Sequence, residues 1–183
     1  KIFVKTGACP QGQGHETTFA QVAADLWRVP IEDVFVTLAD TSQVTMGYGT
    51  IASRSAVTAS GAIQRSSAKL QDKVLKIVAN VLEVPEADLE FRDGKVSVKG
   101  VAELSMTIKE VAKASQPGWN HQRPEGVEAG LEETAYYEPP TVTWAYAANA
   151  AIVEVDISTG EIKIERYVEV HDAGNLINPA IAD

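Results

Sequence analysis

Glycines and small polar residues gather at two places in the chain, each directly ahead of a helical pattern. The first is residues 10–17, which include Gln13, Gly14, His15 and Thr17. Glycine lets a backbone approach a ligand closely, and the N–H groups of a helix's first turn attract anions. The amide of Gln13 and the hydroxyl of Thr17 add polar groups, so this segment is a candidate anion-binding loop. A loop with ordinary glycine turns and polar helix caps is the alternative.

The second place is residues 47–55, which again open a helix and contain Ser53, Arg54 and Ser55. Ser53 or Ser55 fits the cap of that helix. Arg54 is the only charged residue within residues 41–64, and its guanidinium is well shaped for phosphate. A serine cap beside an exposed arginine remains the alternative for this loop taken singly. Two such loops in one chain together favour a polyanionic ligand.

A third polar segment, residues 170–179, follows a strong strand pattern. Loops at the ends of sheets often hold ligands, so the polar groups of this segment are candidates for a site. The same residue types also fit an Asp-x-Gly turn after which Asn-Pro stops the strand. Composition leaves both interpretations open.

Other kinds of site are not supported by the residue pattern. The chain has no G-x-x-x-x-G-K-[ST], no G-x-G-x-x-G after its first strand and no G-x-S-x-G elbow, so P-loop, Rossmann and serine-hydrolase sites are not expected. His15, His121 and His171 lack zinc-ligand spacing, and His15 beside Glu16 is more typical of a helix cap than of an acid–base pair. Cys9 is the only cysteine, so the chain alone cannot form a disulfide or ligate an iron–sulfur cluster.

The composition is that of a folded, acidic protein. The 183 residues include 25 acidic and 16 basic ones, for a formal charge of −9, and the acidic excess lies entirely in residues 66–183. So acidic a chain lacks the basic stripe that nucleic acids need. No apolar run approaches the roughly 18 residues of a membrane span, and the best one covers only residues 144–153. The near-neutral first part still suits an anionic small molecule.

Residues 1–100 are expected to form two similar units, each with a glycine-rich loop, a helix and a strand. Apolar spacing and two prolines, Pro30 and Pro85, mark where the helices must end. The segments 28–34 and 83–89 share the pattern charged-Val-Pro-x-x-Asp-aliphatic, with each helix exit feeding a strand. The predicted elements are strands at 2–6, 34–38, 89–91 and 96–98, and helices from residue 16 to before Pro30 and through 59–81.

The rest of the chain divides into residues 101–130, a helix and an exposed loop, and residues 131–183, a strand hairpin and a cofactor-facing loop. The expected elements are a helix at 107–114 capped by Ser105 or Thr107, an exposed loop at 116–130, a strand at 133–137, and long hairpin strands at 141–156 and 162–170. The predicted class is α+β, with mixed helices and long paired strands in a layered arrangement.

Three motifs in this order make the sequence recognisable: QGQGHETTFAQ at 11–21, GYGTIASRS at 47–55 and HDAGNLINP at 171–179. Together they resemble the molybdenum-binding large subunit of the xanthine oxidase (xanthine dehydrogenase) family, and within it the large subunits of aerobic carbon monoxide dehydrogenase and its aldehyde dehydrogenase and aldehyde oxidase relatives. Residues 136–140 and 156–161 fit the same pattern. The resemblance covers essentially the whole chain.

The resemblance implies that this chain is part of an oxidoreductase. Such enzymes hold molybdenum on molybdopterin, in bacteria usually the cytosine dinucleotide form, and hydroxylate a small-molecule substrate with oxygen from water. Electrons leave through iron–sulfur clusters and FAD on other subunits or domains, which agrees with the single cysteine. By resemblance, the residues that would line the cofactor are Gln13, Gly14, His15, Thr17, Thr50, Ser53, Arg54, Ser55, Asn175 and Asn178.

The sequence also departs from the family pattern. His171 stands where relatives commonly have Asp, Ala173 where some have Cys, and Ile51 and Ala52 where close relatives often have Tyr and Gly. The family's catalytic glutamate lies nearer the C-terminus than this chain reaches, so no catalytic or metal-binding residue is assigned. We expect a cytoplasmic fragment that contacts the rest of the large subunit and is inactive alone. A cofactor-free binding or interaction module that retains the fold is the alternative.

Overall fold

The computed structural model describes residues 1–118 and 122–182. Helices and paired strands alternate along the chain, which confirms the α+β class predicted from the sequence. The contacts divide the chain into two compact units, Lys1–Pro139 and Pro140–Asp183.

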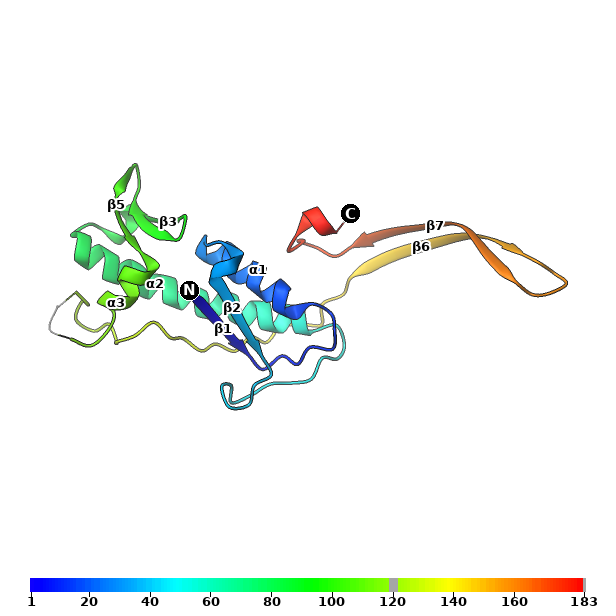
Figure 1. Cartoon of the computed structure of the whole chain (residues 1–183), viewed down its shortest axis with the longest axis horizontal. Coiled ribbons are helices and arrows are strands. Elements are labelled where there is room, and N and C mark those ends of the chain that lie inside the picture. The colour runs from blue at the N-terminus through cyan, green and yellow to red at the C-terminus, as the bar shows by residue number, and fades with distance from the viewer. Residues whose placement is uncertain (119–121, 183) are drawn as a thin grey trace. The chain divides into compact units, whose positions relative to one another are not determined.

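The first unit begins with a parallel pair of strands joined by a helix (Figure 1). Strand β1 (Ile2–Thr6) pairs with β2 (Val34–Leu38), from Ile2 opposite Val34 to Thr6 opposite Leu38. Helix α1 (His15–Trp27) lies between them in sequence, and a 3-10 turn, η1 (Ile31–Asp33), leads into β2. Loop 1, residues 7–14, joins β1 to α1, and loop 2, residues 39–54, follows β2.

The two helix exits share one local structure, as the repeated sequence pattern predicts. Helix α1 ends at Arg28 and helix α2 (Ser55–Leu82) ends at Glu83, and both of these C-caps are left-handed, with φ of 51° and 55°. Val-Pro and a 3-10 turn follow each cap, the second being η2 (Glu86–Asp88). The likeness stops there, because β2 joins a parallel pair whereas β3 (Leu89–Arg92) joins an antiparallel sheet.

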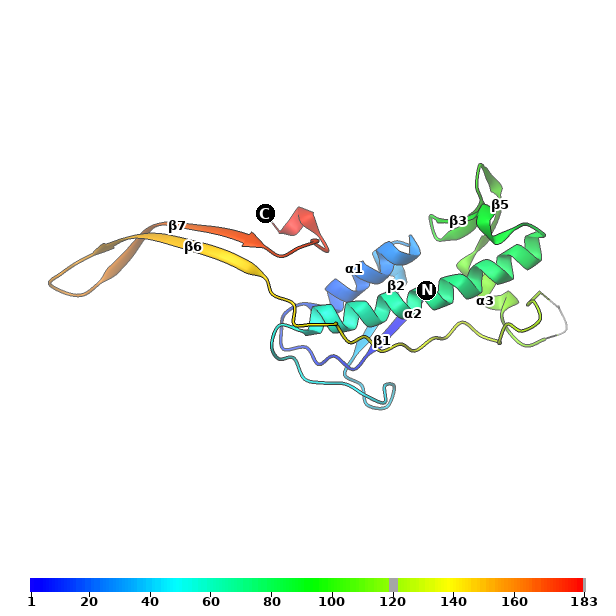
Figure 2. The same ribbon diagram turned by 180° about the vertical axis from the view of Figure 1, so that it is seen from behind.

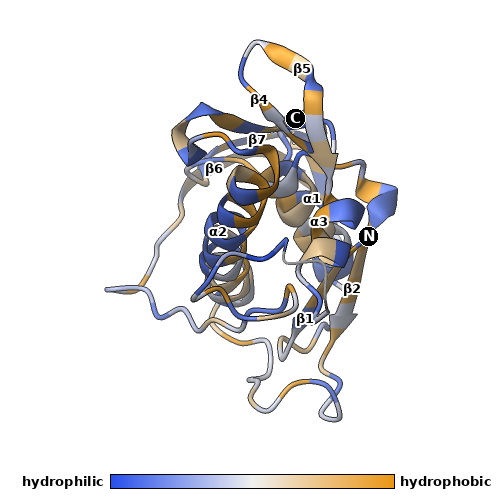
Figure 3. Cartoon of the chain, turned by 90° about the vertical axis from the view of Figure 1, so that its left-hand side faces the viewer, coloured by the Kyte–Doolittle hydropathy of each residue, from blue (hydrophilic) through white to orange (hydrophobic). Residues whose placement is uncertain are grey.

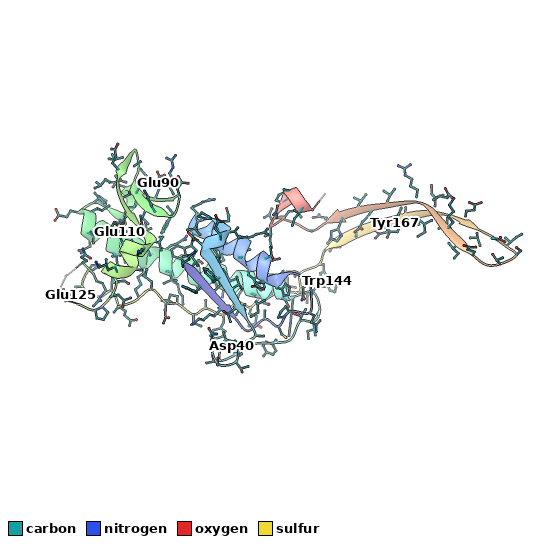
Figure 4. The ribbon with its side chains drawn as sticks, in the orientation of Figure 1. Asp40, Glu90, Glu110, Glu125, Trp144 and Tyr167 are labelled. Carbon is teal, nitrogen blue, oxygen red and sulfur yellow. The ribbon has the colours of Figure 1, made fainter. Side chains whose placement is uncertain are left out.

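That sheet has three strands in the order β3-β4-β5. Strand β4 is Lys95–Val98 and β5 is Val101–Thr107, a strand that the sequence prediction missed. Helix α3 (Ile108–Ala114) follows, and its cap is Thr107 rather than Ser105. The Thr107 hydroxyl accepts from the backbone N–H of Glu110 at 3.2 Å, while a Glu110 carboxylate oxygen accepts from the backbone N–H of Thr107 at 2.8 Å. This is a reciprocal capping box. Figure 4 labels Glu110 on α3.

Helix α2 is the central element of the first unit, because it contributes to two apolar clusters. Its first half packs Ala59 and Ile63 with buried residues of α1, among them Phe19. Its second half packs Val74, Ile77 and Val78 with buried residues of α3 and the three-stranded sheet. Figure 3 shows this amphipathic character, with orange, hydrophobic ribbon along one side of α2 and blue ribbon along the other. One helix thus holds both halves of the unit together.

An extended segment, the strap (residues 122–139), runs along α2 and closes the first unit (Figure 2). Lys69 lies 3.7 Å from Glu133, and Arg65 donates to the carbonyl of Tyr136 at 3.1 Å. The strand expected at 133–137 is wrong: these residues are extended but pair with no strand of the described ranges. Their alternation in burial comes from side chains that pack on a helix instead.

The loop expected to be exposed at 116–130 is only partly so. Residues 116–118 are exposed, but Val127 packs against the core, the backbone N–H of Gly130 donates to Ser115 at 2.9 Å, and Arg123 donates to the same carbonyl at 3.3 Å. His121 lies outside the described residues.

The second unit is a long antiparallel hairpin, as predicted, followed by a 3-10 turn, η3 (Pro179–Ile181). Strand β6 is Tyr146–Val155, so it begins later than the expected residue 141, and β7 is Ile162–Asp172, two residues longer than expected. The turn between them is held by Asp156, whose carboxylate accepts from the backbone N–H groups of Ser158 and Thr159.

The hairpin contains one bulge, where Ile152 pairs with Arg166 but Val153 pairs with Ile164. Glu165 is therefore the extra residue on β7. Directly opposed residues share a face, and successive residues of β6 alternate between faces. Val153 and Ile164 consequently lie on the face opposite to Ile152, so the apolar residues change sides at the bulge.

Candidate anion-binding site

Loops 1 and 2 touch through their backbones at a pair of glycines. A Cβ atom on Gly7 would lie 2.2 Å from the carbonyl oxygen of Met46, and one on Gly47 would lie 2.2 Å from the carbonyl oxygen of Gly7. Two residues further along each loop, Cys9 and Gly49 form a parallel backbone bridge. The glycines permit a close approach that any side chain would prevent, so the two predicted loops form one structure.

A cavity of about 530 Å³ lies where the loops lead into their helices. Helix α1 begins at His15 and helix α2 at Ser55, so two helix N-termini meet at this cavity. Among the residues predicted from the sequence, Gln13, Thr50 and Ser53 also line it. No Asp, Glu, Lys or Arg of the described residues does. The lining is Gln11, Gln13, His15, Thr50, Ile51, Ala52, Ser53, Ser55 and Ala56.

His15 is the buried polar group of the cavity. Its side chain is only 6% exposed, and the ring stacks on Phe19 with 5.1 Å between centroids. Its Nδ1 atom is buried without a hydrogen-bond partner among residues 1–118 and 122–182. Buried polar atoms are nearly always paired, so this unpaired nitrogen in the lining fits a site that a ligand completes.

The backbone of loop 1 occupies the side-chain oxygen of Gln13 but not its NH₂ group. Gly14, the N-cap of α1, is left-handed with φ of 72°, which suits glycine and leaves α1 without a side-chain cap. The side-chain oxygen of Gln13 accepts from the backbone N–H of Gln11 at 2.6 Å. The NH₂ group of Gln13 is therefore the part of this amide that remains for a ligand.

Loop 2 enters α2 through two successive left-handed residues, Ala52 and Ser53, each with φ of 52°. The N-cap of α2 is Arg54, and it makes no side-chain cap, so the predicted capping by Ser53 or Ser55 is wrong. Such strained backbone is maintained only where the surroundings enforce it, and it often occurs at ligand sites. The first-turn N–H groups of α2 are thus not consumed by a capping side chain.

Four predicted site residues, Arg54, Thr17, Thr50 and Ser55, lie differently from the rest. Arg54 is not part of the cavity lining, since its guanidinium stacks over the Tyr48 ring at 5.0 Å. Thr17 is exposed on α1 and is also not part of the lining. Thr50 and Ser55 do line the cavity, but the Ser55 hydroxyl donates to Thr50 at 3.1 Å and the Thr50 hydroxyl donates to the carbonyl of Cys9.

The third motif belongs to the second unit. Asp172 accepts from the backbone N–H of Gly174 at 2.9 Å, which is the Asp-x-Gly turn that the sequence allows, and Asn178 caps η3 by accepting from Ala180 at 3.1 Å. A role for Asn175 and Asn178 at the cofactor stays a prediction.

In the described ranges, no three His, Cys, Asp or Glu residues gather as metal ligands would. Within the same ranges, no helix has both the length and the apolar character that crossing a bilayer requires.

Two helix N-termini at a cavity whose described lining holds no Asp, Glu, Lys or Arg define an α+β domain suited to an anionic ligand. The chain belongs to the molybdopterin cofactor-binding domain family, whose model matches residues 1–183. It is 37% identical over 182 residues to the carbon monoxide dehydrogenase large chain of Afipia carboxidovorans and 38% identical over 183 residues to the nicotine 6-hydroxylase large subunit of Paenarthrobacter nicotinovorans. Each alignment covers 100% of this chain and 22% of the relative.

Solved structures agree with the sequence comparisons. The crystal structure of quinoline 2-oxidoreductase from Pseudomonas putida 86 matches with a TM-score of 0.86 at 38% identity, covering 97% of this chain and 22% of that one. A reconstituted CO dehydrogenase from Oligotropha carboxidovorans matches with a TM-score of 0.85 at 39% identity, covering 96% of this chain and 21% of that one. The family predicted from the three motifs is therefore confirmed.

Proposed function

We propose that the cavity between loops 1 and 2 binds the anionic part of a molybdopterin cofactor, and that this part is the pyrophosphate of the cytosine dinucleotide form. The observation that carries the proposal is the meeting of two helix N-termini at a cavity whose described lining holds no Asp, Glu, Lys or Arg. The partial positive charge of those N-termini and their unpaired N–H groups favour a phosphate.

The residues of the cavity fit this group by their hydrogen-bonding chemistry. The NH₂ group of Gln13 would donate to a phosphate oxygen, and so would the exposed hydroxyl of Ser53. His15 would supply a ring N–H to an anionic oxygen, which would pair its buried Nδ1 atom. When bound, the cofactor supplies the redox chemistry that inserts water-derived oxygen into a substrate. This chain's residues hold and orient it.

The whole protein is proposed to be a molybdenum-dependent hydroxylase or dehydrogenase acting on a small molecule in the cytoplasm. The relatives are named as large chains or subunits of dehydrogenases and hydroxylases, and the chain spans 22% of the two described above. We propose that iron–sulfur and FAD groups on other subunits or domains receive the electrons. The single cysteine agrees with the iron–sulfur part, because this chain does not itself supply the thiolates of a cluster.

Single substitutions at the cavity test the cofactor assignment. Gln13→Ala and Ser53→Ala each remove one donor to a charged group, and such hydrogen bonds are worth about 1.5–3 kcal/mol. We expect molybdopterin content, assayed fluorimetrically after release from the purified protein, to fall by about tenfold or more under limiting cofactor. Gln116→Ala and Ser158→Ala, at exposed positions that do not line the cavity, are the matched controls.

A cofactor-free binding or interaction module is the competing function, favoured by the departures at His171 and Ala173. It predicts that the purified wild-type protein contains no molybdopterin and no molybdenum. If metal analysis finds no molybdenum and the fluorimetric assay finds no molybdopterin, the proposed function is refuted and the module is supported.

A further inference from the structure

The hydrogen bonds of the Thr50 and Ser55 hydroxyls indicate a role other than the cofactor contact that the family resemblance implies. Each hydroxyl has a single proton to donate. The proton of Ser55 goes to Thr50 at 3.1 Å, and the proton of Thr50 goes to the carbonyl oxygen of Cys9. Neither side chain therefore keeps a donor for a phosphate oxygen, in contrast to Ser53.

These two hydrogen bonds connect the start of α2 to loop 1. Ser55 is the first residue of α2 and is 6% exposed, so its position is fixed by the body of that helix. Cys9 lies in loop 1, where its backbone is bridged to Gly49. The chain Ser55–Thr50–Cys9 thus ties the N-terminus of α2 to the loop that leads into α1.

We propose that Thr50 and Ser55 are positioning residues: their hydroxyls fix loop 1 against loop 2 and so set the spacing of the two helix N-termini. They do so without contacting the cofactor. The importance of that spacing rests on the proposed function, but the tie between the loops does not, because only atoms of this chain form it.

Hydrogen exchange on cofactor-free protein tests the tie directly. The protein is purified from a host that makes no molybdopterin, and exchange is followed by mass spectrometry in peptides covering residues 7–14. Thr50→Val removes the hydroxyl while keeping the shape, and the loss of one hydrogen bond predicts about 2- to 12-fold faster exchange. Thr50→Ser keeps the hydroxyl and is expected to exchange like the wild type. Peptides covering β4 and β5 report whether the whole unit has loosened.

Two further variants distinguish a failure of the proposed tie between the loops from a failure of the proposed function. Ser55→Ala breaks the other end of the tie and is expected to speed exchange in residues 47–54, which keeps the proposal testable where Thr50→Val does not fold. Ser53→Ala should lower molybdopterin content without changing exchange in the cofactor-free protein. If Ser53→Ala leaves the content unchanged, the assigned ligand role of Ser53 fails while the tie stands.

The holoprotein supplies the second readout. Thr50→Val is expected to lower molybdopterin content, and Thr50→Ser to restore it. The proposal is overturned if Thr50→Val exchanges like the wild type in residues 7–14, or if Thr50→Ser behaves like Thr50→Val in both measurements. A fall in molybdopterin content with unchanged exchange would instead make Thr50 a direct ligand contact.

Discussion

The change in stability caused by Gly61→Ala should have opposite signs in the presence and in the absence of the Tyr137 side chain. Gly61 lies inside α2, where replacement of glycine by alanine normally stabilises a helix by about 1 kcal/mol. Here a Cβ atom would lie 2.3 Å from Cδ1 and 2.5 Å from Cγ of the Tyr137 ring. Such overpacking costs about 1–3 kcal/mol. Gly61→Ala should therefore destabilise the protein by up to about 2 kcal/mol.

The ring cannot move aside freely, because Arg65 stacks on it at 4.7 Å and also donates to the neighbouring carbonyl of Tyr136. In a Tyr137→Ala background the obstacle is gone, so Gly61→Ala should then stabilise by about 1 kcal/mol. Urea unfolding of the four proteins in this double-mutant cycle measures the coupling. Equal stabilisation by Gly61→Ala in both backgrounds would refute the packing of the strap on α2.

Three further predictions concern the core, a helix cap and the loop contact. Ser67→Ala leaves the buried indole N–H of Trp27 without its 3.1 Å partner and should lower the free energy of unfolding by about 1–3 kcal/mol, measured in urea. The pKa of Glu110 is lowered by the backbone N–H and then the hydroxyl of its capping threonine, so its contribution to stability is fully present above its ordinary pKa. That contribution is lost as the pH falls through the lowered value, and the stability difference between wild type and Glu110→Ala should shrink there. Gly47→Ala would place a Cβ atom 2.2 Å from the facing carbonyl oxygen and should reduce molybdopterin content, whereas Gly49→Ala, with no described atom within 4 Å of its Cβ, should not.

Local signals predicted much of the fold because they depend on neighbours in sequence. Apolar spacing located α1 and α2, and Pro30 and Pro85 located the exits of both helices. The strand expected at 133–137 was wrong, because these residues are extended but pair with no strand of the described ranges, and a local pattern does not identify a partner for their hydrogen bonds. Strand β5 was missed because no turn signal as clear as Asp93-Gly94 announces it.

The candidate site was predictable in its parts but not in its assembly. Glycine-rich loops that open helices were visible in the sequence, and the cavity includes Gln13, His15 and Ser53 as expected. That Gly7 meets Gly47 depends on contact between distant segments, which no local pattern encodes. The burial of His15 and the stacking of Arg54 on Tyr48 likewise depend on residues brought close only by the fold.

The bulge at Glu165 determines how the hairpin's apolar residues can be shielded from water. Val168 and Val170 are exposed on one face, while Ile162 and Ile164 are exposed on the other. In an unbroken strand all four would lie on a single face, because they are spaced two residues apart. With the bulge, a flat surface on one side of the hairpin can cover the apolar side chains of only one of its two halves. A single added residue thus changes a one-sided ribbon into a two-sided one.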